Sequence, residues 1–273
     1  MSTANNTDKK EMTFFEHLEE LRWHLFRSVI VLFIFTAVAF VFKSFVFDII
    51  ILGPKEPWFI TNRFFCHLAE VFDKSVLCIN SKPLQIININ MAGQFTTHIR
   101  ISFLVGFMAG VPYLMLELWR FIKPALYSNE RKVGNLTVLA VNLLFYAGVL
   151  LGYYLICPLS IDFLNSYTVS ESISNTINLN SYITNLSSIC FATGIVFELP
   201  VLAYFFSKIG LLSPQFMREY RKHAIIIILI AAAILTPPDI MSMMLVAIPL
   251  YLLYEVSIYI SASVVKNKKI VND

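Results

Sequence analysis

Charged side chains are scarce in this sequence. They make up 14% of its 273 residues, whereas a soluble domain carries about 25%. The sequence also lacks a metal-binding spacing of cysteine and histidine, a glycine-rich phosphate loop and any low-complexity tract. Its net charge of +3 is too small to indicate nucleic-acid binding. These absences exclude a soluble domain and predict a protein without a cofactor or bound metal.

Hydrophobic residues reach 57% and the mean hydropathy is +0.69, which predicts an integral membrane protein.

Long continuous apolar runs dominate the rest of the chain. They predict membrane-spanning α-helices, because the strands of a membrane β-barrel would alternate apolar and polar residues. The predicted fold is therefore an all-α integral membrane protein with six transmembrane helices. The six segments are Ser28–Phe47, Ile101–Ile122, Val133–Cys157, Ser188–Lys208, Ala224–Thr236 and Ile240–Ser261.

Lysine and arginine predict the orientation of these spans. Fifteen of them lie in the N-terminal segment, the second and fourth connections and the C-terminal tail, and the other six lie in or beside one long loop, where the bias weakens. Both termini are therefore expected in the cytoplasm. The predicted organisation is a cytoplasmic N-terminal segment with an amphipathic helix (1–27), one membrane domain (28–263) and a cytoplasmic tail (264–273). The predicted outer loops are 48–98, 158–187 and the hairpin 236–239, and the cytoplasmic loops are 123–132 and 209–223.

The fifth apolar segment is unusually short. Its 13 residues, Ala224–Thr236, would span about 20 Å as a helix, against a hydrocarbon core of about 30 Å. The next segment follows after only Pro237, Pro238 and Asp239, so a tight hairpin is expected. Either the bilayer thins around this hairpin, or the fifth helix begins earlier, within the polar stretch 218–223.

Several acidic residues lie in or near the spans. Glu198 lies near the centre of the fourth segment, where an ionised acid costs about 2.5–3.5 kcal/mol, so it is a candidate functional residue. Pro200 is expected to kink the same helix. The alternative is a carboxyl that is protonated or hydrogen-bonded within the bundle. Glu117 is closer to the cytoplasmic boundary, and we expect it to be solvated or paired with Arg120, three residues on.

Cys66 and Cys78 lie in the first outer loop. Outside the cytoplasm they could form a disulfide, which would close a short loop and stabilise it by about 3 kcal/mol. The alternative is that both are small apolar residues on a short helix.

Two further acids lie at the predicted cytoplasmic surface. Thr13 and Glu16 form a capping box, which predicts that a helix starts at Phe14 and runs into the first span. Glu20 in this helix has no permanently charged partner among its neighbours Trp23 and His24. Glu130 stands in the connection KPALYSNERK. By spacing alone, both acids would be interpreted as solvated surface charges.

Four motifs occur in an order that resembles a known family. They are HLEELR (17–22), WRFIKPALYSNER (119–131), FELPV (197–201) and TPPD (236–239). Together they resemble the TatC family, the core subunit of the twin-arginine protein translocase, over about residues 12 to 263. The chain departs from the family pattern at His24 and Lys132, where arginine is frequent, and in its longer first outer loop.

The resemblance implies a receptor for folded export substrates whose signal peptides carry two consecutive arginines. By motif match, it implies that Glu20 and Glu130 bind those arginines, with Arg22 and Phe121 beside them. Glu198 would be the intramembrane acid, and Asp239 the acid of the outer hairpin. It further implies short fifth and sixth helices, single-span partner subunits of the TatA/TatB kind, an oligomer of receptor complexes, a bacterial cytoplasmic (inner) membrane location and transport driven by the proton gradient.

The sequence also bears on two other classes of function. A small-solute transporter or channel could use Glu198 as a proton or cation site, but it would predict internal repeats, and none is clear in the sequence. An intramembrane enzyme is not expected, because all five histidines lie outside the spans or at their ends.

Overall fold

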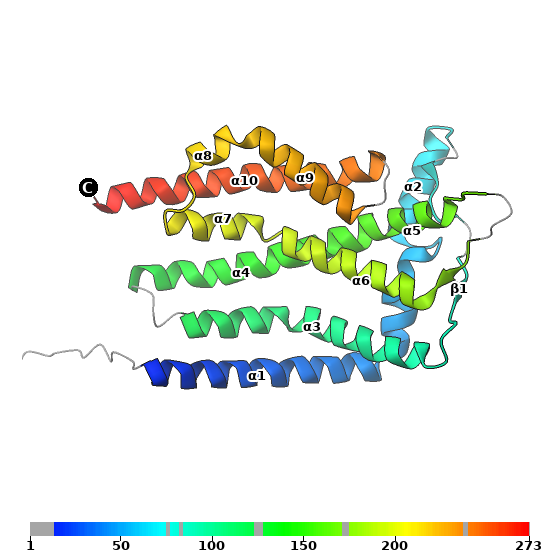
Figure 1. Ribbon diagram of the computed structural model, residues 1–273, viewed down its shortest axis with the longest axis horizontal. Helices are drawn as coiled ribbons and strands as arrows, with labels where there is room; N and C mark the ends of the chain where they lie inside the picture. The colour runs from blue at the N-terminus through cyan, green and yellow to red at the C-terminus, as the bar shows by residue number, and fades with distance from the viewer. Residues whose placement is uncertain are drawn as a thin grey trace, which may run out of the picture.

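The protein is a bundle of long helices that run side by side, as the computed structural model shows (Figure 1). The structure describes residues 14–74, 77–81, 84–122, 128–170, 175–236 and 240–272. Its longer helices are α1 (Phe14–Val41), α3 (Gly93–Ile122), α4 (Ser128–Leu151), α6 (Leu179–Val196), α9 (Arg221–Leu235) and α10 (Ile240–Asn272). Shorter helices are α2 (Ile60–Val71), α5 (Cys157–Ser166), α7 (Leu199–Lys208) and α8 (Pro214–Glu219), with irregular turns η1 (Phe45–Ile51), η2 (Gly53–Lys55) and η5 (Gly152–Ile156).

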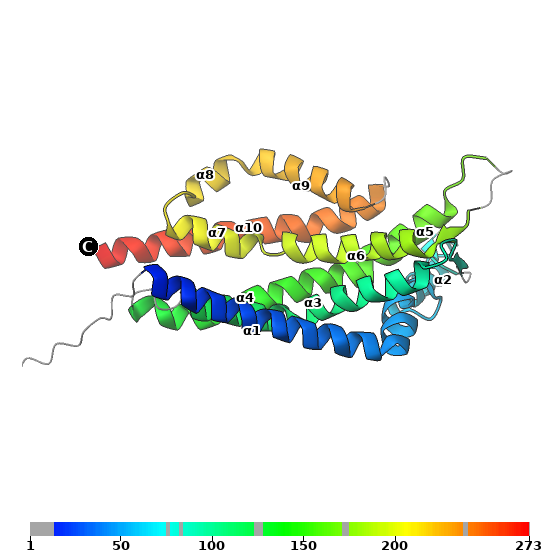
Figure 2. The same cartoon turned by 60° about the horizontal axis from the view of Figure 1, so that its bottom comes forward.

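The bundle has two distinct ends. At one end, which we call the N-terminal end, α1 begins, α3 ends, α4 begins and α10 ends (Figures 1 and 2). The opposite end, which we call the loop end, carries α2 and α5 (Figure 1). A short parallel pair of strands, β1 (Ile86–Ile87) and β2 (Ile177–Asn178), also lies there.

Five helical stretches in the described ranges are long and apolar enough to cross a membrane: 18–41, 93–121, 136–166, 179–208 and 243–266. The helix α9 is shorter, with 15 residues. It runs antiparallel to α10 (Figure 1). It begins at Arg221, so part of the polar stretch 218–223 does belong to it, while α8 and the turn at Tyr220 precede it.

The helices extend further than the apolar runs suggested. The third long stretch continues to Ser166 and α6 already begins at Leu179, so much of the expected loop 158–187 is helical. The expectation of a short sixth helix was wrong, because α10 has 33 residues. Its last turns, SASVVKNKKIVN, contain neither glycine nor proline, so nothing in them ends the helix.

The helix pair α1–α3 has the most extensive contact in the described part of the chain. Near the loop end, the His98 ring stacks on Phe40, with ring centroids 4.0 Å apart. In the middle, Gly106 lies directly against the backbone of Thr36, because a Cβ there would come within 2.6 Å of the Thr36 nitrogen. A small residue is therefore required at this crossing.

At the loop end, the helix α2 is fixed to the rest of the protein by buried polar contacts. The Asn62 side chain donates to the carbonyl oxygens of Pro54 and Glu56, at 3.0 and 2.8 Å. Asn80 donates to Asn62 and to the carbonyl oxygen of Pro158, at 3.2 and 2.9 Å. Cys66 and Cys78 form a disulfide bond. The described part of the connection between α1 and α3 is thus an ordered cap over this end.

Candidate functional site

Two of the motifs meet at the N-terminal end of the bundle. HLEELR lies in the first turns of α1, and the second motif runs from the last turn of α3 into the first turn of α4. All three helix ends lie together in both views (Figures 1 and 2). The resemblance implied signal binding by residues of these two motifs. The helix ends that carry those residues are therefore neighbours in space.

Glu20 is half-buried in this region. Its Oε2 atom is inaccessible to solvent and has no hydrogen-bond partner among the residues that the structure describes. Burying a carboxylate oxygen without a hydrogen-bond donor costs free energy, because nothing replaces the hydrogen bonds that it makes to water. The atom is therefore ready to accept a hydrogen bond from a group outside the described chain.

The carboxylate of Glu117 connects α1 and α3 next to this site. Its side chain is 1% exposed. Its Oε2 contacts Nδ1 of His24 on α1, and its Oε1 accepts a hydrogen bond of 2.8 Å from Nη1 of Arg120. The expected pair with Arg120 is confirmed. The contact with His24 was not expected, and it fixes the start of α1 against the end of α3.

This contact also sets the direction in which Glu20 points. Glu20 and His24 are four residues apart, so they share one face of α1. His24 on that face contacts Glu117, and its ring centroid lies 6.2 Å from that of Phe121. Because α1 and α3 are antiparallel, Glu20 lies one turn beyond Glu117, toward the end of α3.

Arg22 and Glu130 are the remaining predicted signal-binding residues, and the structure describes the side chain of Arg22 but not that of Glu130. Arg22 is exposed, and two residues of separation turn it to a different face of α1 from Glu20. The structure does not bring Arg22 and the Glu20 carboxylate together. Glu130 lies in the first turn of α4, but its side chain lies outside the described residues, as does Asp239 of the predicted outer hairpin.

Replacing Glu117 with alanine is expected to lower the free energy of unfolding by about 2 kcal/mol, the scale of hydrogen bonds to a charged group. The variant loses both the contact with His24 and the Arg120 bond. Thermal denaturation of the detergent-purified protein measures this effect.

Glu255→Ala is the matched control for that measurement. Glu255 also joins two helices, since it accepts a 2.8 Å bond from Arg221, but its side chain is 21% exposed and that of Arg221 is 44% exposed. A pair this accessible contributes about 0–1 kcal/mol. Equal losses in the two variants would contradict the role given to Glu117.

Glu198 lies where the fourth long helix is interrupted. The helix α6 ends at Val196, and α7 begins at Leu199 with Pro200 in its first turn. Proline cannot donate a backbone hydrogen bond, so this interruption agrees with the kink expected at Pro200. Oε1 of Glu198 is buried and has no partner among the described residues.

The Glu198 side chain lines an apolar groove of about 360 Å³ between α3, α4 and the α6–α7 break. Its other lining residues are Phe107, Val111, Met115, Leu118, Trp119, Thr137, Val138, Val141, Phe145, Phe191, Ile195, Val201, Leu202 and Phe205. The indole Nε1 of Trp119 is also buried without a partner in the described ranges. The groove thus offers an apolar surface with an unpaired acceptor (Glu198 Oε1) and an unpaired donor (Trp119 Nε1) in the described ranges, which suits an apolar helix carrying a polar group.

Comparison with known proteins agrees with the motifs. The family model for the Sec-independent protein translocase protein (TatC) matches residues 16–249. The chain belongs to the TatC family. The TatC protein of Blattabacterium sp. subsp. Periplaneta americana is 41% identical over 96% of this chain and 99% of its own length. That of Aquifex aeolicus is 32% identical over 94% of this chain and 98% of its own length.

A solved structure matches the fold as well. A crystal structure of a twin-arginine translocase receptor, TatC, superimposes with a TM-score of 0.64 at 31% identity, and it covers 92% of this chain and 100% of the other. TatC proteins are membrane subunits of a protein translocase and do not form an enzyme family. This chain is therefore a Tat translocase component, and the solute-transporter alternative is not favoured.

Proposed function

We propose that this TatC protein is the receptor for twin-arginine signal peptides, and that the peptides bind at the N-terminal end of the bundle between Glu20 and Glu130. The observation that carries the proposal is the buried Oε2 of Glu20, which has no partner among the described residues. Guanidinium presents a planar pair of donors that matches a carboxylate, and lysine cannot reproduce this geometry. Two adjacent arginines therefore suit two acids on neighbouring helix ends.

The N-terminal end of the bundle is then the cytoplasmic end, with both termini inside and six spans, α9 being the fifth. The lysine and arginine distribution supports this orientation. Glu198 and its groove would take the transmembrane helix of a single-span TatA/TatB-type subunit, since the groove is apolar apart from a few groups. Several such receptor complexes would assemble in the bacterial inner membrane, and the proton gradient would drive transport.

Export in cells tests this function. A Glu20→Ala, Glu130→Ala double variant is expected to lose export of a twin-arginine reporter, while a Sec-dependent reporter is exported normally, because only the first route needs the two acids. Glu19→Ala is the matched control, since Glu19 is an exposed acid next to Glu20 in the same helix. Undisturbed reporter export in the double variant would refute the assigned receptor site. Loss of both reporters would indicate misfolding, which the amount of protein in the membrane would show.

A further inference from the structure

The helix α2 lies across the bundle at the loop end instead of along it. Its axis runs across the direction of the long helices (Figure 1). Because the long helices cross the membrane, a helix in this position lies roughly parallel to the membrane plane. Its 12 residues are far too few to span a bilayer.

The side chains of α2 are divided into three faces. Thr61, Asn62 and Ala69 are buried against the rest of the protein. A polar strip, which we define as Arg63, His67 and Glu70, is exposed. Beside it runs an apolar strip, Ile60, Phe64 and Val71, whose side chains are 70%, 58% and 65% exposed. The spacing i, i+4, i+11 aligns the apolar strip on one side of the helix.

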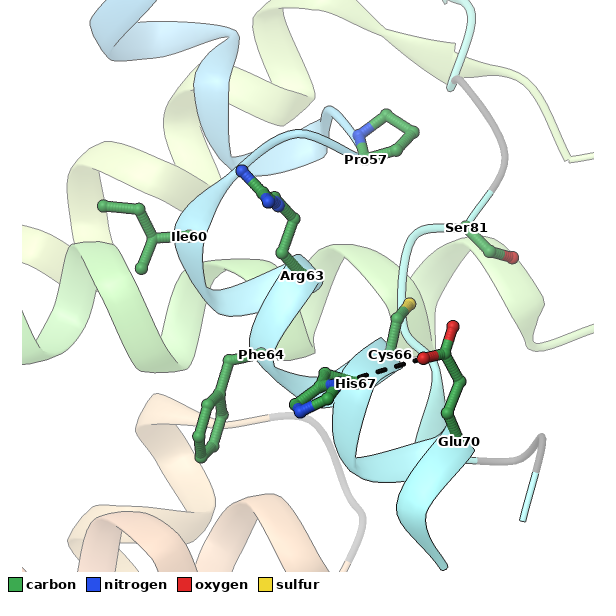
Figure 3. Close-up of a pocket in the computed structure, with 8 residues that line it drawn as sticks. All are labelled: Pro57, Ile60, Arg63, Phe64, Cys66, His67, Glu70 and Ser81. Carbon is green, nitrogen blue, oxygen red and sulfur yellow. Dashed lines mark ion pairs between the residues drawn. The ribbon is translucent and has the colours of Figure 1, made fainter. Parts of the chain in front are cut away.

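The apolar strip faces the spans. In Figure 3, Ile60 and Phe64 project toward the side of α2 on which the ribbons of the long helices continue, whereas Glu70 and Cys66 lie on the other side. Exposed apolar residues also continue along the chain from the first span to α2, through Phe45 (55% exposed) and Trp58 (53% exposed). The segment that joins the first span to the strip thus also exposes apolar side chains.

The polar strip offers one guanidinium, that of Arg63, to a lipid headgroup. Glu70 lies 3.8 Å from Nδ1 of His67, so its charge has a neighbour in the strip. Arg63 forms no ion pair with any residue in the described ranges. A guanidinium at the edge of an apolar strip is well placed to bind the phosphate of a lipid headgroup.

We propose that α2 is an interfacial helix, and that its Ile60, Phe64 and Val71 strip is immersed in the outer leaflet of the bilayer. Amphipathic helices of this kind bury their apolar face about 5–10 Å into the boundary between headgroups and acyl chains. The buried Asn62 contacts and the Cys66–Cys78 bond then hold the helix at that depth. The outer cap contacts lipid as well as water.

Site-specific photo-crosslinking to lipid tests this proposal. p-Benzoylphenylalanine replaces Phe64, or in a second protein Val71, and the full chain alone is reconstituted in phosphatidylcholine vesicles and irradiated. Mass spectrometry of the α2 peptide is expected to show a lipid adduct at both positions, at least about fivefold above that at Glu70, the control on the polar strip. An intact Cys66–Cys78 bond in each protein shows that the cap is folded.

A replacement at Phe33, which is 73% exposed in the middle of the first span, supplies the positive control. Lipid adducts at Phe33 but not at positions 64 and 71 would overturn the proposal. Crosslinks from position 64 to a second copy of the chain would also overturn it, since the strip would then be a protein interface. The export assay is independent of this result, so failure here would not affect the receptor assignment.

Discussion

Replacing Glu20 with glutamine is expected to weaken binding of a twin-arginine peptide to the purified protein by about tenfold to a hundredfold. Glutamine keeps the shape and one acceptor oxygen but removes the charge. A hydrogen bond to a charged group contributes about 1.5–3 kcal/mol, which corresponds to that range. The effect is large because Oε2 of Glu20 is already buried, so a guanidinium there replaces no hydrogen bond to a described residue.

Glu19→Gln is the control for this binding measurement. It removes the same charge one residue away, from an exposed side chain on a different face of α1. Its expected effect is small, because exposed ion pairs contribute about 0.2–1 kcal/mol. If the two variants bind the peptide equally weakly, the loss in Glu20→Gln comes from the lower negative charge of the surface and not from a specific contact. The site assignment would then be wrong.

Replacing Gly106 with alanine is expected to destabilise the protein by about 2–3 kcal/mol, the cost of overpacking a tight contact. The new Cβ would lie 2.6 Å from the nitrogen and 2.7 Å from the Cα of Thr36. Both are backbone atoms, so the helix α1 itself must move away from α3. The midpoint of thermal denaturation in detergent should fall accordingly.

Gly110→Ala is the matched control in the same helix. A Cβ at Gly110 would meet only Phe35 Cδ2, at 3.9 Å, which is an ordinary contact. Since alanine is favoured over glycine in a helix by about 1 kcal/mol, this variant should be neutral or slightly stabilised. A loss of stability at Gly110 as large as at Gly106 would contradict the close approach of α1 and α3 at Gly106.

Local signals in the sequence were sufficient for much of the fold. The interruption near Pro200, where a kink was expected, and the Glu117–Arg120 pair follow from such signals, because each depends on residues within four positions. Gly106 and Gly110 lie four positions apart in α3, and only the structure shows that Gly106 is the one of the two in tight contact with α1. The length of α10 was misjudged because apolarity was used to mark its end.

Contacts between distant segments could not be predicted in this way. His24 and Glu117 are 93 positions apart, and no periodicity links them. Both lie within about one and a half turns of the predicted cytoplasmic boundary, however, and that shared depth was a usable signal. The pairing of Ile86–Ile87 with Ile177–Asn178 and the crosswise position of α2 also depend on long-range packing. For the site, the motifs identified the residues. Only the structure showed that Oε2 of Glu20 is buried and has no hydrogen-bond partner among the described residues.

A double-mutant cycle tests the central claim, that the Glu20 carboxylate directly binds an arginine of the signal peptide. Binding of a twin-arginine peptide and a twin-lysine peptide would be measured with the unaltered protein and with Glu20→Gln. The account predicts a coupling energy of about 1–3 kcal/mol, because the arginine-to-lysine penalty should largely disappear once the carboxylate is gone. An unchanged penalty in the variant, and thus no coupling, would contradict it.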